Sequence, residues 1–492
     1  MQEASSKRGT PRKSRRWAGA AGAALVLAAA AGGAGLYLVA GTGIAPRALG
    51  SYLERRSMGH NAVIEGIGHK ASAWLVGADR GEQAPNGTSW SGTAGVQATG
   101  TGATPGKAAP AGLEVLVSDS AGLLRAIAAA TPGQRITLLP GSYRIGRTIH
   151  ASRPGTAEAP IVVRSLEPGS VRLDVATNEG FRVAAPYWRF ENLSLQGVCA
   201  RHDECEHAFH VVGEAHHFAA VNNQIVDFNA HFKINADNGH FPDNGLLESN
   251  TLRNRSIRQT AKPVTPIDMV TVSHWSVRLN LIADFVKGDG DGVSYGAFAK
   301  GGGSDNLIER NIVVCEDRLR GAPGQRVGLS LGGGGTGKSY CRDGKCITEQ
   351  SGSTLRANLV AACSDEGIYL NAAARSSVLH NTLVDTAGIM VRFPESSAEI
   401  QGNLVDGSIR SRDGGIVRQD DNLVTATARL YLGSHPYRAL FRDPGALDFQ
   451  WREPAPRRAQ AGEPVADLCG GRRPAQPRYG AFEDFSACLK RQ

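Results

Sequence analysis

The chain has 492 residues and a formal net charge of +8, and 41% of its residues are hydrophobic but only 6% aromatic. Residues 1–16 alone carry a net charge of +5, which leaves only +3 for all the others. The body is therefore nearly neutral, and its bulk charge does not support the basic surface typical of nucleic-acid-binding proteins. We expect no nucleic-acid partner, and the composition indicates no oligomeric state.

The first 40 residues have the pattern of a membrane signal. Residues 17–40 contain no charged side chain, and this length is sufficient to span a bilayer. The basic residues 1–16 precede it, and by the positive-inside rule they stay in the cytoplasm while the remainder is exported. The sequence thus predicts a basic cytoplasmic tail (1–16), a transmembrane anchor (17–40) and a single-pass protein whose bulk is periplasmic or extracellular. A cleaved signal peptide is the alternative.

The segments that follow differ in composition. Residues 41–80 suit a juxtamembrane helical segment, and residues 81–112, which are mostly Gly, Ala, Thr, Ser and Pro, suit a flexible linker. Residues 120–130 predict a helix that begins at Ser118 or Ser120 and caps the first unit of a repeat domain. We expect this domain to span residues 113–450 and a C-terminal tail to span residues 451–492.

An asparagine followed by a short apolar run recurs along the repeat domain. Spacings of roughly 20 to 30 residues are typical of stacked supersecondary units. We interpret the pattern as an all-β fold, a right-handed parallel β-helix. Asparagine tolerates the left-handed φ of a sharp corner, and stacked amides can satisfy buried backbone groups. A leucine-rich repeat is the rival, but its tighter leucine frame is absent. The recurring positions are Asn192, Asn223, Asn250, Asn280, Asn311, Asn358, Asn381, Asn403 and Asn422.

The eight cysteines suit an exported protein with disulfide bonds. Their spacing suggests two short loops, a clip in the C-terminal tail and a bridge between adjacent coils. A zinc site is the alternative, but Cys-x4-Cys without a matching second pair is a weak zinc pattern. The expected pairs are Cys199–Cys205, Cys341–Cys346, Cys469–Cys488 and Cys315–Cys363.

The start of the repeat domain carries a more specific pattern. The run ATPGQRITLLPGSYR, followed by GTAEAPIVVRS, resembles the opening of the chondroitinase-B-like and alginate-lyase-like right-handed β-helix polysaccharide lyases. The resemblance covers about residues 115–425. It implies an acidic, uronate-containing polysaccharide as partner and cleavage by β-elimination. The alternatives are a uronate C5-epimerase and a non-catalytic carbohydrate-binding or envelope-assembly protein.

In strands that alternate apolar and polar residues, the polar positions face outward and stack from coil to coil. Aligning them by pattern places one residue of each coil in a first column and the residue two positions later in a second column. These columns form a wall of groups suited to sugars. The first holds Arg182, His210, Lys233, Met269, Ser294, Ser330, Tyr369 and Met390, and the second holds Asn235, Thr271, Gly296, Gly332, Asn371 and Arg392.

Lys300, followed by small residues and Asp305-Asn306, is similar to the lysine motif of this lyase family, which implies that Lys300 is the Brønsted base. The family expects Arg-His-Gly on the following coil, but this chain has Leu331 followed by four glycines. Arg392 or Arg326 can substitute for the missing arginine if the fold brings one of them near. The candidate catalytic residues are Lys300, Arg392 and Tyr369, and the candidate substrate-binding residues are Lys233, Asn235, His210, Asn371, Tyr295 and Arg326.

A Gly-Asp-Gly-Asp-Gly loop carries Asp289 and Asp291. Carboxylates are preferred ligands of Ca²⁺, and Glu349, Asp365 and Glu366 are further carboxylates that a calcium site can use. A plain turn is the alternative because only two carboxylates are local. The sequence thus gives Ca²⁺ as the one candidate cofactor.

Overall fold

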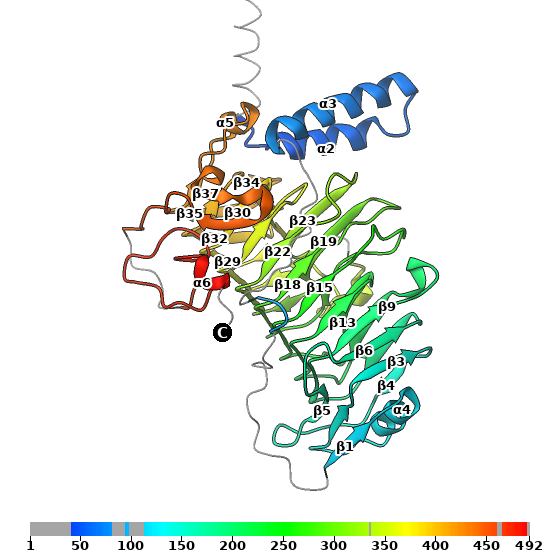
Figure 1. Ribbon diagram of the computed structural model, residues 1–492. Coiled ribbons are helices and arrows are strands. Elements are labelled where there is room, and N and C mark those ends of the chain that lie inside the picture. The colour runs from blue at the N-terminus through cyan, green and yellow to red at the C-terminus, as the bar shows by residue number, and fades with distance from the viewer. Residues whose placement is uncertain (1–40, 81–93, 98–112, 334–335, 460–464, 490–492) are drawn as a thin grey trace, which may run out of the picture.

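The computed structural model describes residues 41–80, 94–97, 113–333, 336–459 and 465–489 (Figure 1). The predicted cytoplasmic tail (1–16) and transmembrane anchor (17–40) lie outside the described residues, as does most of the predicted linker. No helix in the described part of the chain is both long and apolar enough to cross a membrane.

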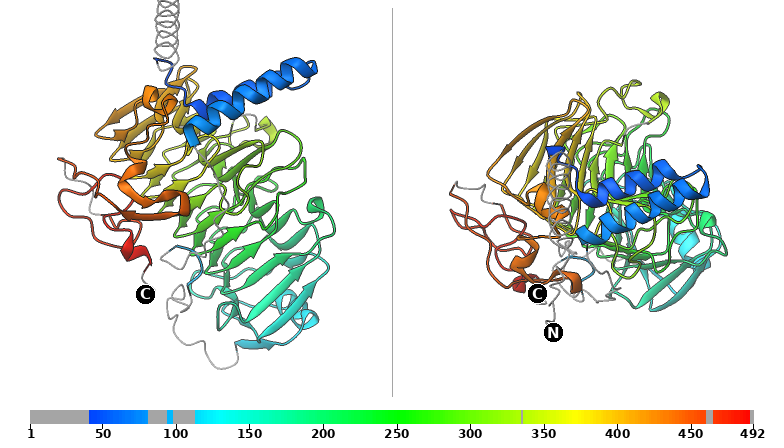
Figure 2. Two further views of the ribbon diagram at one scale, coloured as in Figure 1. Left: turned by 45° about the horizontal axis from the view of Figure 1, so that its top comes forward. Right: turned by 90° about the horizontal axis from the view of Figure 1, so that it is seen from above.

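The described chain winds into a parallel β-helix whose coils contribute strands to three long parallel sheets, as expected for the right-handed form (Figures 1 and 2). Sheet A contains β1 (Glu114–Val117), β2 (Arg135–Leu138), β5 (Ile161–Ser165), β8 (Trp188–Glu191), β11 (Ala219–Val221), β14 (Leu246–Glu248), β17 (Ser276–Arg278), β21 (Leu307–Glu309), β25 (Thr354–Arg356), β29 (Ser376–Leu379), β32 (Ser397–Gln401) and β35 (Ile416–Asp420). Sheet B contains β3 (Gly141–Ile145), β6 (Val171–Val175), β9 (Ser194–Gly197), β12 (Gln224–Val226), β15 (Thr251–Arg253), β18 (Leu281–Ala283), β22 (Ile312–Val314), β26 (Leu359–Ala361), β30 (Thr382–Val384), β33 (Leu404–Val405) and β36 (Leu423–Val424).

Sheet C is the sheet that bears the candidate site. It contains β4 (Ile149–Ala151), β7 (Glu179–Val183), β10 (His207–Val212), β13 (Ala230–Asn235), β16 (Ile267–Val270), β19 (Val293–Lys300), β23 (Gln325–Leu331), β27 (Ile368–Asn371), β31 (Gly388–Arg392) and β34 (Ser408–Arg412). A short sheet of β20 (Gly303–Ser304), β24 (Gln350–Ser351) and β28 (Ala373–Ala374) and an antiparallel pair, β37 (Phe441–Asp443) and β38 (Asp448–Trp451), complete the strands. Single 3₁₀ turns lie at His202–Glu204, Lys338–Tyr340, Arg438–Leu440 and Pro444–Ala446.

Inward side chains of successive coils stack in the core. Phe181, Phe209 and Phe232 lie on paired strands of sheet C, and their ring centroids are 5.1 and 5.3 Å apart. All three are fully buried. Burying a large apolar side chain stabilises a fold by about 1.5–3 kcal/mol, so each coil adds to one continuous core.

The amide ladder is confirmed, with one change of register. From Asn250 to Asn422, the Oδ1 of each ladder asparagine accepts two hydrogen bonds from the asparagine one coil earlier, one from its backbone N–H and one from its Nδ2. At the start of the ladder, Asn223 Oδ1 accepts only the backbone N–H of Leu193. Asn192 lies one position before the ladder. The expected left-handed φ belongs to the residue before each ladder asparagine, for example Arg310 (φ 55°) before Asn311. The prediction assigned the left-handed φ and the side-chain hydrogen bonds to the same asparagine. In the structure the residue before the asparagine has the left-handed φ, and the asparagine makes the hydrogen bonds.

The two ends of the β-helix are covered by helices. Helix α4 (Ser120–Ala128) covers the first coils with its buried Leu123 and Ile127, and its N-cap is Asp119, whose carboxylate accepts the Gly122 N–H at 2.6 Å. The predicted end of the β-helix at residue 450 was wrong, because β36, the last strand of its three sheets, ends at Val424. Helix α5 (Thr427–Tyr431) follows, and the remaining chain with α6 (Ser486–Leu489) packs against sheet B.

All four predicted disulfide pairs are present: Cys199–Cys205, Cys315–Cys363, Cys341–Cys346 and Cys469–Cys488. The Cys315–Cys363 pair follows the paired strands β22 and β26 and so joins adjacent coils. The described chain contains no free cysteine.

Residues 46–80 form a helical hairpin of α2 (Pro46–Ser57) and α3 (Ala62–Arg80), which lies across the late coils of the β-helix (Figures 1 and 2). Buried ion pairs hold its base in place. Arg47 Nε lies 2.7 Å from Asp79, Arg47 Nη1 lies 2.8 Å from Asp385, and Arg80 Nη1 lies 3.4 Å from Glu316. Burial opposes the charged form of Asp385, but Arg80 and Arg47 together hold the pKa of this carboxyl well below its usual range.

Candidate functional site

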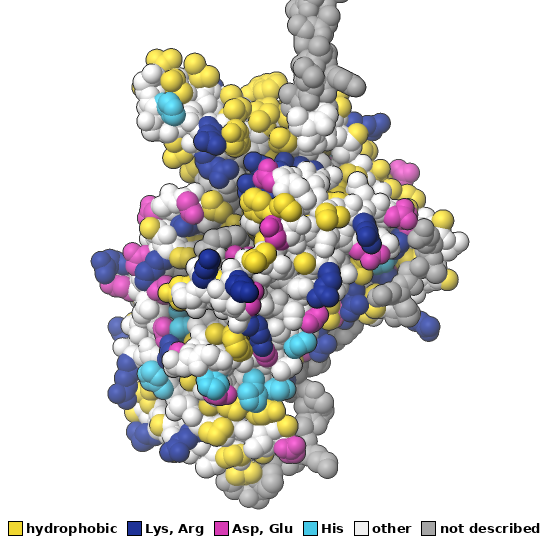
Figure 3. Space-filling model, turned by 180° about the vertical axis from the view of Figure 1, so that it is seen from behind, with side chains coloured by type: hydrophobic (Ala, Val, Ile, Leu, Met, Phe, Trp, Pro, Cys, Tyr) yellow, Lys and Arg dark blue, Asp and Glu magenta, His cyan; other side chains and the backbone are white. Residues whose placement is uncertain are grey.

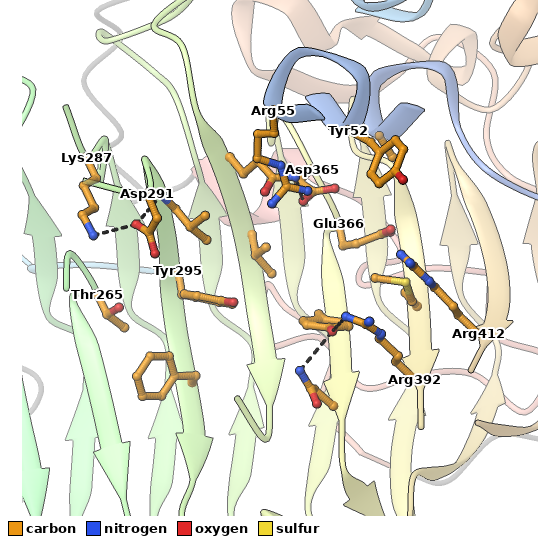
Figure 4. A pocket seen from close by; sticks show the side chains of 18 of the residues that line it. Tyr52, Arg55, Thr265, Lys287, Asp291, Tyr295, Asp365, Glu366, Arg392 and Arg412 are labelled. Carbon is orange, nitrogen blue, oxygen red and sulfur yellow. Dashed lines mark hydrogen bonds and ion pairs between the residues drawn. The ribbon is translucent and has the colours of Figure 1, made fainter. Parts of the chain in front are cut away.

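A groove of about 840 Å³ runs over the outer face of sheet C, with α2 above it (Figure 4). The sheet positions its floor, because outward side chains of paired strands stack about 4.8 Å apart. The groove brings together nine of the predicted site residues. These are Lys233, Asp291, Tyr295, Lys300, Asp365, Glu366, Tyr369, Asn371 and Arg392.

The hydrogen-bond register corrects both predicted columns. Asp268 and Phe298, not Met269 and Ser294, lie between Lys233 and Ser330 in the first column. Met269 is buried in the core. The apolar pair Met269-Val270 obscures the alternation of β16. In β19 the apolar-polar-apolar triplet is Val293-Ser294-Tyr295, but the segment that pairs with Ile267–Met269 is the wholly apolar Ala297-Phe298-Ala299.

In the second column, Val270 and Lys300 replace Thr271 and Gly296. The column continues through Gly332, which follows β23, to Asn371 and Arg392. Lys300 and Asn371 are therefore two coils apart, about 10 Å at the coil spacing of a parallel sheet. Gly332 leaves the position between them without a side chain.

Lys300 ends β19 and reaches into the groove. Its Nζ lies 4.5 Å from the centre of the Phe298 ring. Within the described residues, its ammonium has no ion-pair or hydrogen-bond partner. An amine without a partner among these residues, beside a position that carries no side chain, is available to a ligand.

Tyr369, Asn371 and Arg392 form a hydrogen-bonded cluster two to three coils along the groove from Lys300. The Tyr369 hydroxyl accepts from Asn371 Nδ2 at 3.0 Å and from Arg392 Nη1 at 3.4 Å. Both donors occupy oxygen lone pairs, so the phenolic O–H is left to donate. Burial raises the pKa of Tyr369, and Arg392 opposes this rise. The arrangement keeps the phenol protonated and positions it as a proton donor.

The floor of the groove combines aromatic faces with charge. Tyr295, Val327, Tyr369 and Met390 form a small apolar cluster, and burial raises the pKa of Tyr295 to about 12. Lys233 Nζ donates to Asp268 at 2.9 Å near the other end of the groove. Rings with nearby donors suit a sugar, which has apolar faces and hydroxyl edges.

Five predicted residues lie outside the groove: His210, Asn235, Arg326, Asp289 and Glu349. His210 is bound between Glu179 at 2.7 Å and Asn235 at 2.9 Å, and Asn235 borders a neighbouring pocket of about 630 Å³. The Arg326 guanidinium is buried and bonds Glu316 and the carbonyls of residues 322 and 323. It faces the interior, so the substrate-binding prediction for Arg326 was wrong. Asp289 is exposed in a turn.

The carboxylates predicted for Ca²⁺ do not gather into one site. Asp291 is paired with Lys287 at 2.7 Å, Glu366 with Arg410 at 2.7 Å, and Glu349 accepts from Gly301 N. The described residues include no group of three or more His, Cys, Asp or Glu side chains placed to hold a metal ion. The donor set does not fit a calcium shell, and a role for Ca²⁺ stays a prediction.

Several residues that line the groove were not predicted from the sequence. Arg410 and Arg412 pair with Met390 and Arg392 on the next coil, and extending the alternation into Ser408–Arg412 would have found them. Tyr52 and Arg55 of α2 also line the groove, and Arg55 lies above Asp365 (Figure 4). No local sequence pattern predicts the contact between α2 and sheet C, because the two segments are distant in sequence.

Asp365 is the most perturbed acid of the groove. Gln325 Nε2 donates to it at 2.7 Å. Burial, and then the neighbouring charge of Glu366, raise its pKa to about 7. The groove end under α2 therefore gains negative charge as the pH rises through neutrality.

Known proteins resemble the chain in fold only. The sequence matches no known protein-family model and no curated protein. The crystal structure of pectate lyase Pel9A is 14% identical over 79% of this chain and 100% of that chain, with a TM-score of 0.53. An alginate lyase from Paenibacillus sp. str. FPU-7 is 14% identical over 63% of this chain and 99% of that chain, with a TM-score of 0.35. The A-module of the Azotobacter vinelandii mannuronan C-5 epimerase AlgE4 is 12% identical over 63% and 92%, with a TM-score of 0.41. At these identities the likeness to the pectate lyase shows that the chain shares the parallel β-helix fold.

Proposed function

We propose that the protein is a lyase that cleaves an acidic, uronate-containing polysaccharide by β-elimination in the groove of sheet C. The observation that carries the proposal is the opposition of Lys300 to the Tyr369–Asn371–Arg392 cluster across the side-chain-free position at Gly332. The fold shared with pectate lyase Pel9A agrees with it. The exported location and the membrane anchor remain part of the same proposal.

The reaction needs a base, a group that offsets the carboxylate charge and an acid for the leaving oxygen. Lys300 Nζ, as a neutral amine, would take the proton from the carbon next to the carboxylate. The electrons of that C–H bond form a carbon–carbon double bond, and the bond to the glycosidic oxygen breaks. Tyr369 gives its phenolic proton to that oxygen. Arg392, whose Nη1 lies 3.4 Å from the Tyr369 hydroxyl, would offset the negative charge of the carboxylate.

The α2 roof adds a constraint on the substrate. It lies over the end of the groove that holds Asp365, Arg410 and Arg412, whereas Lys233 lines the other end. A chain bound along the β-helix axis would enter from the Lys233 side and end under α2. This geometry favours release of short products from a chain end.

The test is incubation of the protein with polygalacturonate, alginate or chondroitin, followed by the ultraviolet absorbance of the unsaturated uronate. Lys300→Ala should abolish the signal, and Lys345→Ala, an exposed lysine outside the groove, should not. Unchanged turnover in Lys300→Ala would exclude it as the base. Deuterium uptake from D₂O without absorbance would instead indicate an epimerase, and binding without either would indicate a binding protein.

A further inference from the structure

The outer face of α3 has the reverse of the polarity expected for a surface helix. Val63, Ile67 and Trp74 are 70%, 64% and 67% exposed. Their spacing of four and seven residues places them on one side of the helix. A helix on a globular protein normally turns such residues toward the core. Figure 3 shows hydrophobic side chains gathered on the projecting hairpin.

The inner face of α3 carries small residues at its middle and Leu75 beyond them. Gly68, Ser72 and Leu75 are buried, and a Cβ added to Gly68 would come within 2.0 Å of Ser57 Oγ. Small residues let two helices approach closely, as in helix pairs of membrane proteins. Val63, Ile67 and Trp74 lie on the opposite face, outside the α2–α3 contact, and need another partner.

The chain around the hairpin indicates which partner this is. The described structure begins at residue 41, directly after the uncharged apolar segment 17–40. Lys70 lies within the apolar face, and the exposed Arg56 lies in the last turn of α2. Tryptophan among aliphatic residues, with basic residues nearby, is typical of a helix lying in the headgroup region of a membrane with anionic lipids.

We propose that the outer face of α3, defined by Val63, Ile67, Lys70 and Trp74, lies on an anionic lipid bilayer. The contact would set the β-helix against the membrane surface and fix the direction in which the groove opens. The inference rests on the hairpin and on the membrane anchor of the proposed function at residues 17–40, and it does not depend on the polysaccharide chemistry. A second copy of the chain is the competing occupant of the face.

The test uses the full chain reconstituted in vesicles of phosphatidylcholine and phosphatidylglycerol, with and without brominated acyl chains. The emission of Trp74 is obtained as the difference between the wild type and Trp74→Phe. We expect brominated lipid to quench this difference emission and aqueous acrylamide to leave it largely unquenched. Trp451→Phe is the matched control, because Trp451 stacks on Phe441 in the C-terminal region, and its difference emission should not respond to brominated lipid.

Circular dichroism confirms folding of each variant, and folding is expected because Trp74 has little contact with the rest of the protein. Quenching of the Trp74 emission by acrylamide but not by brominated lipid would overturn the proposal. A dimer that is lost in a Val63→Ser/Ile67→Ser variant, without lipid quenching of Trp74, would overturn it in favour of the second copy.

Discussion

Asn311 belongs to the coil that carries Lys300, and its replacement by alanine tests how the amide ladder holds the site. The side chain is fully buried and makes four hydrogen bonds. Its Oδ1 accepts from the N–H and the Nδ2 of Asn280, and its Nδ2 donates to the Val277 carbonyl and to Asn358 Oδ1. At about 1 kcal/mol for each net bond, Asn311→Ala should cost about 4 kcal/mol.

The matched control is Asn422→Ala at the last rung. Asn422 also makes four hydrogen bonds, but it is only half-buried, so water can replace its partners. We expect its loss to cost about 1 kcal/mol or less. Denaturant unfolding followed by circular dichroism gives the overall loss, and native-state hydrogen exchange of β22 shows whether the coil opens locally.

Equal losses in the free energy of unfolding for Asn311→Ala and Asn422→Ala would refute the reasoning. Burial would then not determine how much each ladder asparagine contributes to stability. A loss at Asn311 below about 1 kcal/mol would refute it as well. In either case the stacked side chains would support the coils mainly by packing.

Three further results are expected. Tyr369→Phe should lower turnover by about 10²–10⁴-fold, as for loss of a general acid, while the affinity for an acidic oligosaccharide stays within error in a titration. Because Asp365 is neutral below its pKa of about 7 and charged above it, binding of that oligosaccharide should weaken as the pH rises through 7, and Asp365→Asn should remove this dependence. Asp385→Asn should leave Arg47 and Arg80 incompletely paired, at a cost of about 3–5 kcal/mol, and expose the α2–α3 hairpin to protease. In the wild type this stabilisation is complete above pH of about 4 and is lost as the pH falls toward the lowered folded-state pKa of Asp385; a hairpin equally resistant at every pH would contradict that role.

The fold could be predicted from the sequence because its signals are local and repeated. Each coil carries its own apolar pattern and amide, and four cysteine pairs follow from spacing. The site depends on the hydrogen-bond register between coils, which the sequence specifies only weakly where two apolar residues adjoin, as at Met269-Val270. A shift of one residue turns a side chain to the opposite face of a sheet, which is why Asp268 was missed and Met269 was included.

The two candidate arginines also show that the local sequence does not determine which way a side chain faces. Arg326 and Arg392 both lie in sheet C strands with polar alternation, yet Arg326 begins β23 beside buried Glu316 and turns inward, whereas Arg392 ends β31 and lies in the groove. The partner of each guanidinium comes from another loop, so no window of sequence around either arginine distinguishes them.

The positions of the cations argue for an extended ligand rather than a small one. Lys233, Lys300 and Arg392 lie on the first, third and sixth of six consecutive coils, which places them about 10 and 14 Å apart along the axis at the parallel-strand spacing. A single small anion would contact one of them. A linear polyanion laid along the axis would contact all three and pass over Gly332, which lies between Lys300 and Asn371. The solenoid thus converts a repeat in sequence into a row of charges along the axis, and such a row suits the linear polyanion of the proposed function better than a small ligand.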